Sequence, residues 1–205
     1  MTDDCNIFSL GTLVEALCRP EGYEPERLRS LSRQGPDLVS HFIEAVLSSD
    51  EDQMQKKLAL LADYLSDKSS SAAWLNLGRL AAGLFFRRAA EEYFEKSAGL
   101  ARAQGDSEGA SQAWSFLGSL YSDDEDWDRA CRFYEKALDV GKSLPLMCSI
   151  LANLGRAARL QGDLCKAEQC YSQALHLQGA DDHCGRADAL YCLGEICQNA
   201  SLQNV

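Results

Sequence analysis

Four Leu-Gly pairs at nearly regular spacing constrain the fold of this chain more than any other feature of its sequence. They begin at Leu77, Leu117, Leu154 and Leu193, so neighbouring pairs lie 40, 37 and 39 residues apart. A period of this length indicates one supersecondary unit that is repeated along the chain. Because a single pair of helices cannot bury its apolar face alone, the repeats are expected to stack and to share one core.

The copy with the clearest pattern runs from Gln112 to Ala137 and reads QAWSFLGSLYSDDEDWDRACRFYEKA. Its first half places four residues on one face of a helix, at positions i, i+3, i+4 and i+7: Trp114, Leu117, Gly118 and Tyr121. Its second half has small and aromatic residues at helical spacing: Ala130, Tyr134 and Ala137. The acidic segment 123–125 suits the start of the second helix, where carboxylates are favourable. The pattern therefore predicts two helices joined by a short turn.

This pattern resembles the tetratricopeptide repeat, whose first helix (helix A) reads W-x2-L-G-x2-Y and whose second helix (helix B) contains A-x3-F. Tyr134 stands where the family has Phe. The family's commonest period is about 34 residues. The longer period here, 37–40 residues, is similar to that of Pins-type polarity scaffolds, rapsyn and bacterial peptide-sensing regulators. The resemblance covers roughly residues 71–199. It implies an all-α fold, a right-handed α-solenoid of helix-turn-helix repeats with an N-terminal helical cap.

The repeats divide the chain into two expected parts. Residues 1–68 are expected to form N-terminal helices, in which the pair at 36–48 and 51–66 lacks the repeat signature and so acts as a degenerate repeat or a cap. The rest, 71–205, is expected to hold three repeats and a final helix: 71–107, 108–143, 144–180 and 184–199. That last helix either caps the solenoid or marks a chain cut from a longer one. Within the repeats, helices are predicted at 71–83, 86–104, 108–122, 126–140, 145–160 and 164–178.

Composition narrows the class of partner and the compartment. The formal charge of −11 argues against nonspecific binding of nucleic acid and against an anionic membrane surface. The sequence has no run of 18 apolar residues, so no membrane span is expected. Nine cysteines without a paired framework indicate a reducing compartment, the cytoplasm or the nucleus. The N-terminus has no signal-peptide layout, and we expect a cytoplasmic protein.

Three short motifs that are typical of catalytic or metal sites are better explained by the repeats. Gly105–Gly109 matches G-x-S-x-G, but the predicted helices on both sides leave no strand for a nucleophile elbow. Gly141–Ser143 matches only the end of a P-loop. Cys165 and Cys170 lie five residues apart, which separates them by about 140° around a helix and disfavours a shared zinc site. We therefore expect no enzyme, no cofactor and no metal.

The candidate binding site lies on the face of the A helices opposite the Leu-Gly stripe. In the family that this chain resembles, that face lines a concave groove that holds peptides, and an Asn before Leu-Gly often holds the ligand backbone. The tetrapeptide Asn-Leu-Gly-Arg occurs twice here, at 76–79 and 153–156, and Phe116 replaces the Asn between them. An amide both donates and accepts hydrogen bonds, and an arginine fork binds carboxylates. The candidate groove residues are Asn76, Arg79, Ser115, Phe116, Ser119, Asn153, Arg156, Arg159 and Tyr191.

These features predict a noncatalytic protein–protein interaction module of the adaptor or scaffold type, which binds a peptide or protein segment in its groove. The partner is expected to carry acidic residues or a free C-terminus, because Arg79, Arg156 and Arg159 are basic residues in an acidic protein. The alternative is the repeat part of a larger enzyme or ligand-sensing regulator whose active part lies outside this chain. A further alternative is that these polar side chains are only the solvated face of the helices.

Overall fold

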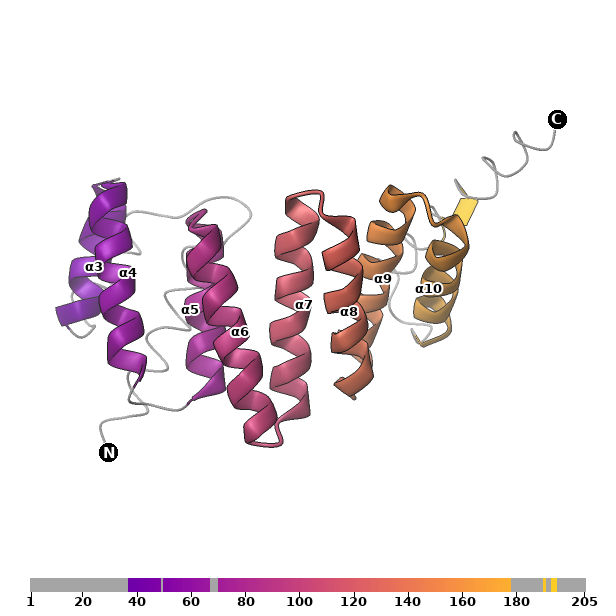
Figure 1. Ribbon diagram of the computed structural model, residues 1–205, viewed down its shortest axis with the longest axis horizontal. Coiled ribbons are helices and arrows are strands. Elements are labelled where there is room, and N and C mark those ends of the chain that lie inside the picture. The colour runs from indigo at the N-terminus through magenta and orange to yellow at the C-terminus, as the bar shows by residue number, and fades with distance from the viewer. Residues whose placement is uncertain (1–36, 49, 67–69, 178–189, 191–192, 195–205) are drawn as a thin grey trace. The chain divides into compact units, whose positions relative to one another are not determined.

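The computed structural model describes residues 37–48, 50–66, 70–177, 190 and 193–194 of the 205-residue chain. Within these residues the chain forms helices and turns and no strand, so the all-α prediction is confirmed. The helices, shown in Figure 1, are α3 (Asp37–Leu47), α4 (Glu51–Ser66), α5 (Ser71–Gly83), α6 (Arg87–Ala103), α7 (Ser107–Asp123), α8 (Trp127–Val140), α9 (Leu144–Gln161) and α10 (Leu164–Leu177). None of the helices in the described part is long and apolar enough to cross a membrane. The segment before residue 37 and most of the predicted helix 184–199 lie outside the described residues.

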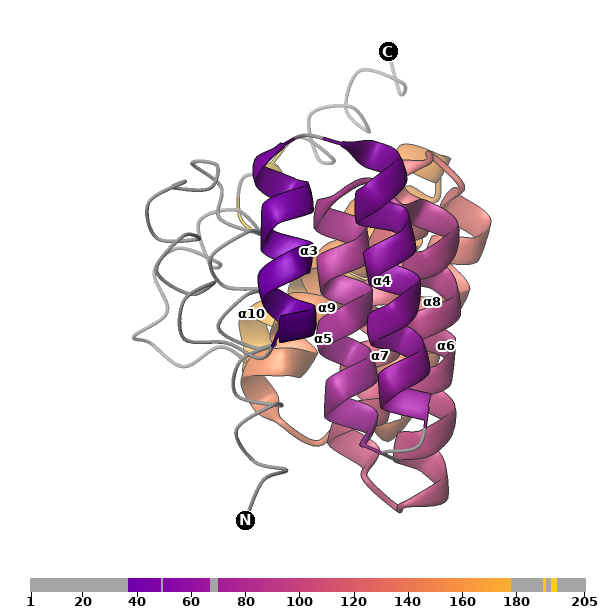
Figure 2. The ribbon, with the colours of Figure 1, turned by 90° about the vertical axis from the view of Figure 1, so that its left-hand side faces the viewer.

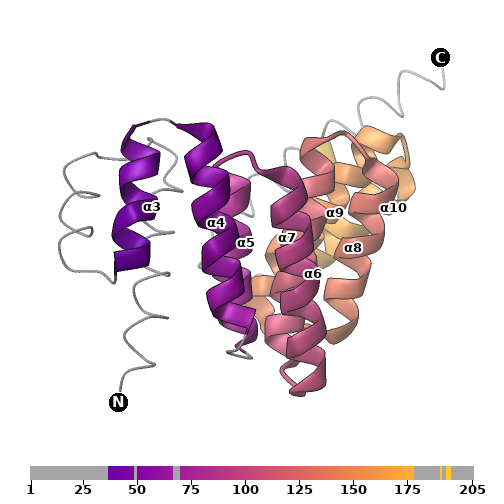
Figure 3. The ribbon, with the colours of Figure 1, turned by 60° about the vertical axis from the view of Figure 1, so that its left-hand side comes forward.

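The chain divides into two compact units between Leu100 and Ala101, and each unit is considered by itself. In unit 1, α3 and α4 lie side by side, as Figure 2 and Figure 3 both show, and α4 also contacts α5. Helix α5 packs against α6 through Trp74 and Tyr93, whose ring centroids are 5.6 Å apart. In unit 2, α7 pairs with α8 and α9 pairs with α10, while α9 contacts both α7 and α8. The predicted helical hairpins are therefore present in both units.

Each hairpin closes where the glycine of the Leu-Gly pair faces the aromatic ring of helix B. A Cβ atom built on that glycine would stand 2.5, 2.7 and 3.0 Å from the nearest ring carbon, in the pairs Gly78–Phe94, Gly118–Tyr134 and Gly155–Tyr171. Distances below 3.0 Å are essentially never adopted by real Cβ atoms. The Leu-Gly pairs therefore recur because any larger residue would push helix A and helix B apart.

A second contact recurs between the start of helix A and the last turns of helix B, always across 26 residues. In α5–α6, Ser97 Oγ donates to the carbonyl oxygen of Ser71 at 2.8 Å. In α7–α8, Ser111 Oγ donates to the carbonyl oxygen of Ala137, also at 2.8 Å. In α9–α10, a cysteine takes the serine's place, and its Sγ lies 4.0 Å from the equivalent carbonyl oxygen. In α5–α6 the donor is on helix B, and in the other two hairpins it is on helix A. The two serine hydrogen bonds thus help to fix the register of α5–α6 and α7–α8, and the cysteine makes a weaker contact at the same place.

The turns between helix A and helix B share one pattern of backbone hydrogen bonds, in which the first or second residue after helix A is left-handed. That residue is Phe85 (φ 62°), Glu125 (φ 60°) or Gly162 (φ 94°). In each turn its N–H donates to the carbonyl oxygen three residues earlier, and the next N–H donates to the carbonyl oxygen five residues earlier. This arrangement satisfies carbonyl groups at the end of helix A, and it usually uses glycine. Two of the three turns adopt it without glycine.

Aspartates cap the starts of several helices. The sequence pattern predicts the acidic segment 123–125 at the start of the second helix, but Asp123 is the last residue of α7 and the cap of α8 is the next acidic residue, Asp126. Asp50 Oδ1 accepts from the backbone N–H of Gln53 at 3.0 Å, before α4. Asp126 closes the acidic turn 123–126 and caps α8, where its Oδ1 accepts from the backbone N–H of Arg129 at 3.1 Å. Each such cap satisfies one of the free N–H groups in the first turn of a helix.

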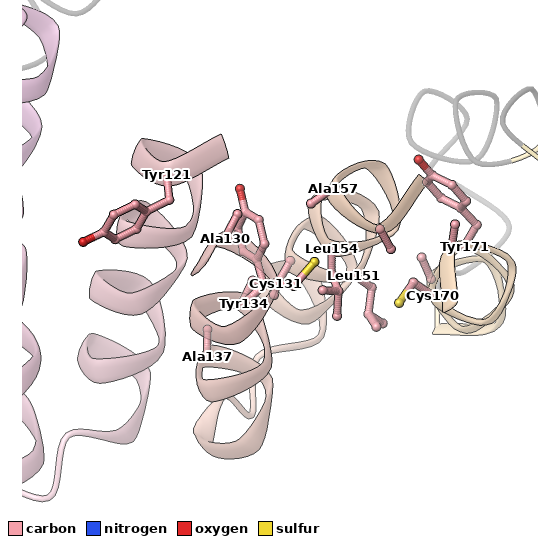
Figure 4. Packing of buried hydrophobic residues seen from close by; sticks show 14 residues of the cluster. Tyr121, Ala130, Cys131, Tyr134, Ala137, Leu151, Leu154, Ala157, Cys170 and Tyr171 are labelled. Atoms are coloured by element: carbon pink, nitrogen blue, oxygen red, sulfur yellow. The ribbon is translucent and has the colours of Figure 1, made fainter. Parts of the chain in front are cut away.

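The core of unit 2 extends without interruption through both hairpins, from Tyr121 on α7 to Ala174 on α10. Figure 4 shows its middle, where Cys131 of α8 faces Leu151 and Leu154 of α9. The apolar positions of helices A and B are therefore buried by neighbouring hairpins as well as by their own partner helix, as expected of stacked repeats.

Candidate functional site

The structure describes eight of the nine predicted groove residues, and Tyr191 lies outside the described part of the chain. Unit 1 contributes Asn76 and Arg79, which lie one turn apart on α5 and are both half-buried. Unit 2 contributes the other six, on α7 and α9. We call these six the α7–α9 face: Ser115, Phe116, Ser119, Asn153, Arg156 and Arg159. Five of the six are half-buried and Arg156 is exposed, so all of them lie outside the core.

Part of the α7–α9 face gathers around the phenol of Tyr134 on α8. Ser119 Oγ of α7 and Tyr134 Oη lie 3.1 Å apart, within hydrogen-bond distance. Burial raises the pKa of Tyr134 above its ordinary value of 10.0, while the hydrogen bond to Ser119 and the positive charge of Arg156 act in the opposite direction. The phenol therefore stays protonated at neutral pH and serves as a neutral hydrogen-bonding group. The hydroxyl of Tyr134 on α8 thus meets Ser119 of α7 and is also influenced by the charge of Arg156 on α9.

Asn153 and Arg156 form a second polar pair, one turn apart on α9. Arg156 Nη2 donates to Asn153 Oδ1 over 3.5 Å, which is a long hydrogen bond. The contact orients the amide so that its NH2 group points away from the guanidinium. Since Arg156 is exposed, its other N–H donors can reach a carboxylate in solution. The pair can therefore offer one amide and one fork of donors to an extended segment.

Sequence reasoning missed Tyr134 as a member of this site. Its ring fills the signature aromatic position of helix B and is completely buried, so the pattern indicates a core residue. The one available signal was the exchange of the family's Phe for Tyr, which adds a hydroxyl group at the edge of the core. That hydroxyl lies next to Ser119, a predicted groove residue.

The motifs that resemble catalytic sites are turns. Within Gly105–Gly109, Asp106 caps α7 and Ser107 is the first residue of that helix, so no strand precedes the serine. Gly141–Ser143 links the end of α8 to the start of α9. Among the described residues, no three His, Cys, Asp or Glu side chains come together in a way that could hold a metal ion.

We expect Cys165 to react much faster with iodoacetamide than Cys170 in the native protein. Both thiols are free and both lie on α10, but Cys165 is exposed and Cys170 is buried. Burial raises the pKa of Cys170 to about 11, and the thiolate is the reactive species. Trypsin cleaves after Lys166 and next after Arg186, so Cys165 lies on one peptide and Cys170 shares the following peptide with Cys184. Fragment-ion sequencing of these peptides after a short labelling time reports each thiol separately. Equal labelling of Cys165 and Cys170 under native conditions would show that α10 does not pack as described. As a control, the two thiols should be labelled equally in urea, where the helix is unfolded.

Comparison with known proteins identifies the repeat. The sequence profile of the tetratricopeptide repeat matches residues 69–143 and 110–180, which together cover more than half of the 205-residue chain. A search of curated proteins found no match.

Solved structures share the fold at low sequence identity. The chain is similar to BtubC (BKLC) from P. vanneervenii, with 17% identity, a TM-score of 0.55, and coverage of 82% of this chain and 70% of that one. It is similar to the apo form of the quorum sensor NprR from B. thuringiensis, with 15% identity, a TM-score of 0.62, and coverage of 86% and 53%. It is also similar to the MamA protein, with 16% identity, a TM-score of 0.51, and coverage of 83% and 92%. Together with the repeated glycine–aromatic contacts, the profile match shows that this chain belongs to the tetratricopeptide repeat family.

Proposed function

We propose that this chain is a noncatalytic adaptor or scaffold that binds an extended peptide segment along the α7–α9 face. The repeat fold itself suggests a protein-interaction scaffold. The observation that carries the finer proposal is that Ser119, Asn153 and Arg156 lie at partly or fully exposed positions of α7 and α9, with Arg156 hydrogen-bonded to Asn153 and Ser119 held by the buried hydroxyl of Tyr134. Hydroxyl, amide and guanidinium groups are thereby grouped where a partner can reach them.

The side chains of the α7–α9 face fit an extended backbone that ends in, or carries, a carboxylate. The hydroxyl of Ser119 and the amide of Asn153 can exchange hydrogen bonds with peptide groups. Arg156 can bind a carboxylate, and Phe116 supplies an apolar contact beside them. The whole chain carries a charge of −11, so an acidic segment is repelled elsewhere. Such complementarity fixes the register of the segment and its rate of association more than its affinity.

Unit 1 repeats the same chemistry on α5 with Asn76 and Arg79. The repetition of Asn-Leu-Gly-Arg supports a second binding face of the same kind, considered separately from the α7–α9 face. Both faces would then select acidic side chains or a free C-terminus.

A selection from displayed random peptides with free C-termini tests the proposal. We expect enrichment of peptides with Asp, Glu or a required C-terminal carboxylate. The enriched peptide, synthesised with a free and with an amidated C-terminus, is then titrated by fluorescence anisotropy. For a peptide without acidic side chains, amidation should weaken binding strongly, because the carboxylate is the group that Arg156 receives. Enrichment of basic peptides instead would contradict the proposal.

The alternative of a repeat region within a larger enzyme or regulator is distinguished by mass. An intact mass measured on the protein from its native source should equal that of the 22.5 kDa chain if the module stands alone. A substantially larger mass would favour the alternative.

A further inference from the structure

The turn between α5 and α6 exposes an aromatic ring to a degree that no other large apolar residue approaches in the described part of the chain. Phe85 is 93% exposed, whereas the other exposed large hydrophobic residues are 47–55% exposed. Its neighbours Leu84 and Phe86 are half-buried, and the exposed Arg88 follows in the first turn of α6. The turn therefore presents an exposed aromatic ring three residues before an exposed arginine, and burying that ring against a partner would be favourable.

The backbone at Phe85 is in a conformation that favours glycine. Its φ is 62°, and the equivalent residue in the α9–α10 turn is Gly162, with the same pair of backbone hydrogen bonds. Glycine would satisfy the turn with less strain, so folding alone does not explain a phenylalanine here. Residues that combine strain with full exposure are characteristic of binding surfaces.

Unit 2 contains a pocket whose chemistry complements this turn. The pocket, of about 500 Å³, lies between the α7–α8 turn and the end of α9. Its apolar wall is Trp127 and Leu160, and Leu160 is 49% exposed. Its rim carries the carboxylates of Asp124, Glu125, Asp126 and Asp128.

The internal bonds of the pocket leave its net charge strongly negative. Asp126 pairs with Arg129 at 2.5 Å, and Asp128 accepts a hydrogen bond from Gln161. The residues that line the pocket thus include four carboxylates and no cationic side chain beside the apolar wall. An aromatic ring can lie against Trp127 while a cation beside it meets the carboxylates. The volume is in the usual range of a pocket that receives a bound group, about 300–1,000 Å³.

We propose that this chain associates with a second copy of itself, the α5–α6 turn of one copy docking into the acidic pocket of the next. Phe85 packs against Trp127 and Leu160, and Arg88 lies among the rim carboxylates. The charge complementarity of the two surfaces and the strained exposure of Phe85 support this occupant. Because the turn and the pocket are different surfaces, each contact uses the turn of one copy and the pocket of the other. The contact is small, so it is weak and salt-dependent.

Mixing two variants tests the contact between turn and pocket. Phe85→Gly removes the ring and keeps the left-handed turn, so its melting temperature should equal or exceed that of the wild type. Leu160→Lys places a cation in the pocket that repels Arg88. We expect sedimentation velocity to show concentration-dependent association of the wild type and monomers for each variant. An equimolar mixture should form one-to-one dimers and nothing larger, because it retains one intact turn and one intact pocket per pair.

A monomeric wild type up to its solubility limit would overturn the proposal, as would a Phe85→Gly variant that associates like the wild type. Should Phe85→Gly fail to fold, Arg88→Glu, an exposed change on α6, replaces it with the same expectation. Phe85 and Arg88 belong to neither proposed peptide-binding face, so Phe85→Gly and Arg88→Glu should leave peptide affinity unchanged. Failure of self-association is thus distinguishable from failure of the proposed peptide binding.

Discussion

Replacing Gly118 with leucine should lower the free energy of unfolding by about 3 kcal/mol, at the upper end of the usual cost of overpacking a core. Even a Cβ at this position would lie 2.7 Å from ring carbons of Tyr134. That ring is completely buried and cannot move into solvent, so α7 and α8 must separate. Urea denaturation followed by far-ultraviolet circular dichroism, which reports helix content, measures the change in the free energy of unfolding.

Gly99 provides the matched control. It lies inside α6, is exposed, and has nothing within 4 Å of the place where a Cβ would stand. Gly99→Ala should therefore raise the free energy of unfolding by roughly 0.5–1 kcal/mol, since glycine is a poor residue for a helix interior. If Gly118→Leu were as harmless as Gly99→Ala, the close contact between α7 and α8 would be wrong.

The double variant Asn153→Ala/Arg156→Ala should weaken binding of the selected peptide between about tenfold and a hundredfold. A hydrogen bond to a charged group contributes about 1.5–3 kcal/mol, and each 1.4 kcal/mol corresponds to about tenfold in affinity. Exposure of Arg156 places the expected loss toward the lower part of this range, because solvent and salt screen its charge. Anisotropy titrations at low and high salt measure both the loss and its screening.

Arg132→Ala removes the same charge from an exposed position on α8 and serves as the control. Its affinity for the peptide should equal that of the wild type. Tyr134→Phe should lie between the two, because it removes only the hydroxyl beside Ser119. Equal losses for Arg132→Ala and for the double variant would mean that net charge, and not the α7–α9 face, determines binding.

The helices could be predicted from the sequence because the Leu-Gly spacing, the periodic apolar positions and the acidic caps all agree. The helix expected at 71–83 is Ser71–Gly83, and the one expected at 145–160 is Leu144–Gln161. The helix expected to begin at residue 86 begins at Arg87 instead. The left-handed Phe85 ends α5, and Phe86 completes the turn before α6 starts. The division of the chain at 68–71, the repeat boundaries and the C-terminal helix stay predictions.

The candidate site was less accessible to sequence reasoning. The pattern placed Ser119, Asn153 and Arg156 on helix faces away from the core, but it could not show that Tyr134 brings a hydroxyl to the same point. Residues 119 and 134 meet only through the packing of α7 on α8. Similarly, the apolar turn at Leu84 and Phe85 was visible in the sequence. The near-complete exposure of Phe85 follows from its left-handed backbone, which composition does not reveal.

Photo-crosslinking tests most directly the central claim that a peptide lies along the α7–α9 face. p-Benzoylphenylalanine is introduced in place of Phe116 on α7 or, as a control, in place of Arg132 on α8. Each variant is irradiated with the selected peptide, and mass spectrometry identifies which of the two variants becomes covalently linked to the peptide. We predict a crosslink from the Phe116 site that excess unlabelled peptide abolishes, and none from the Arg132 site. A crosslink from the Arg132 site alone would contradict the account.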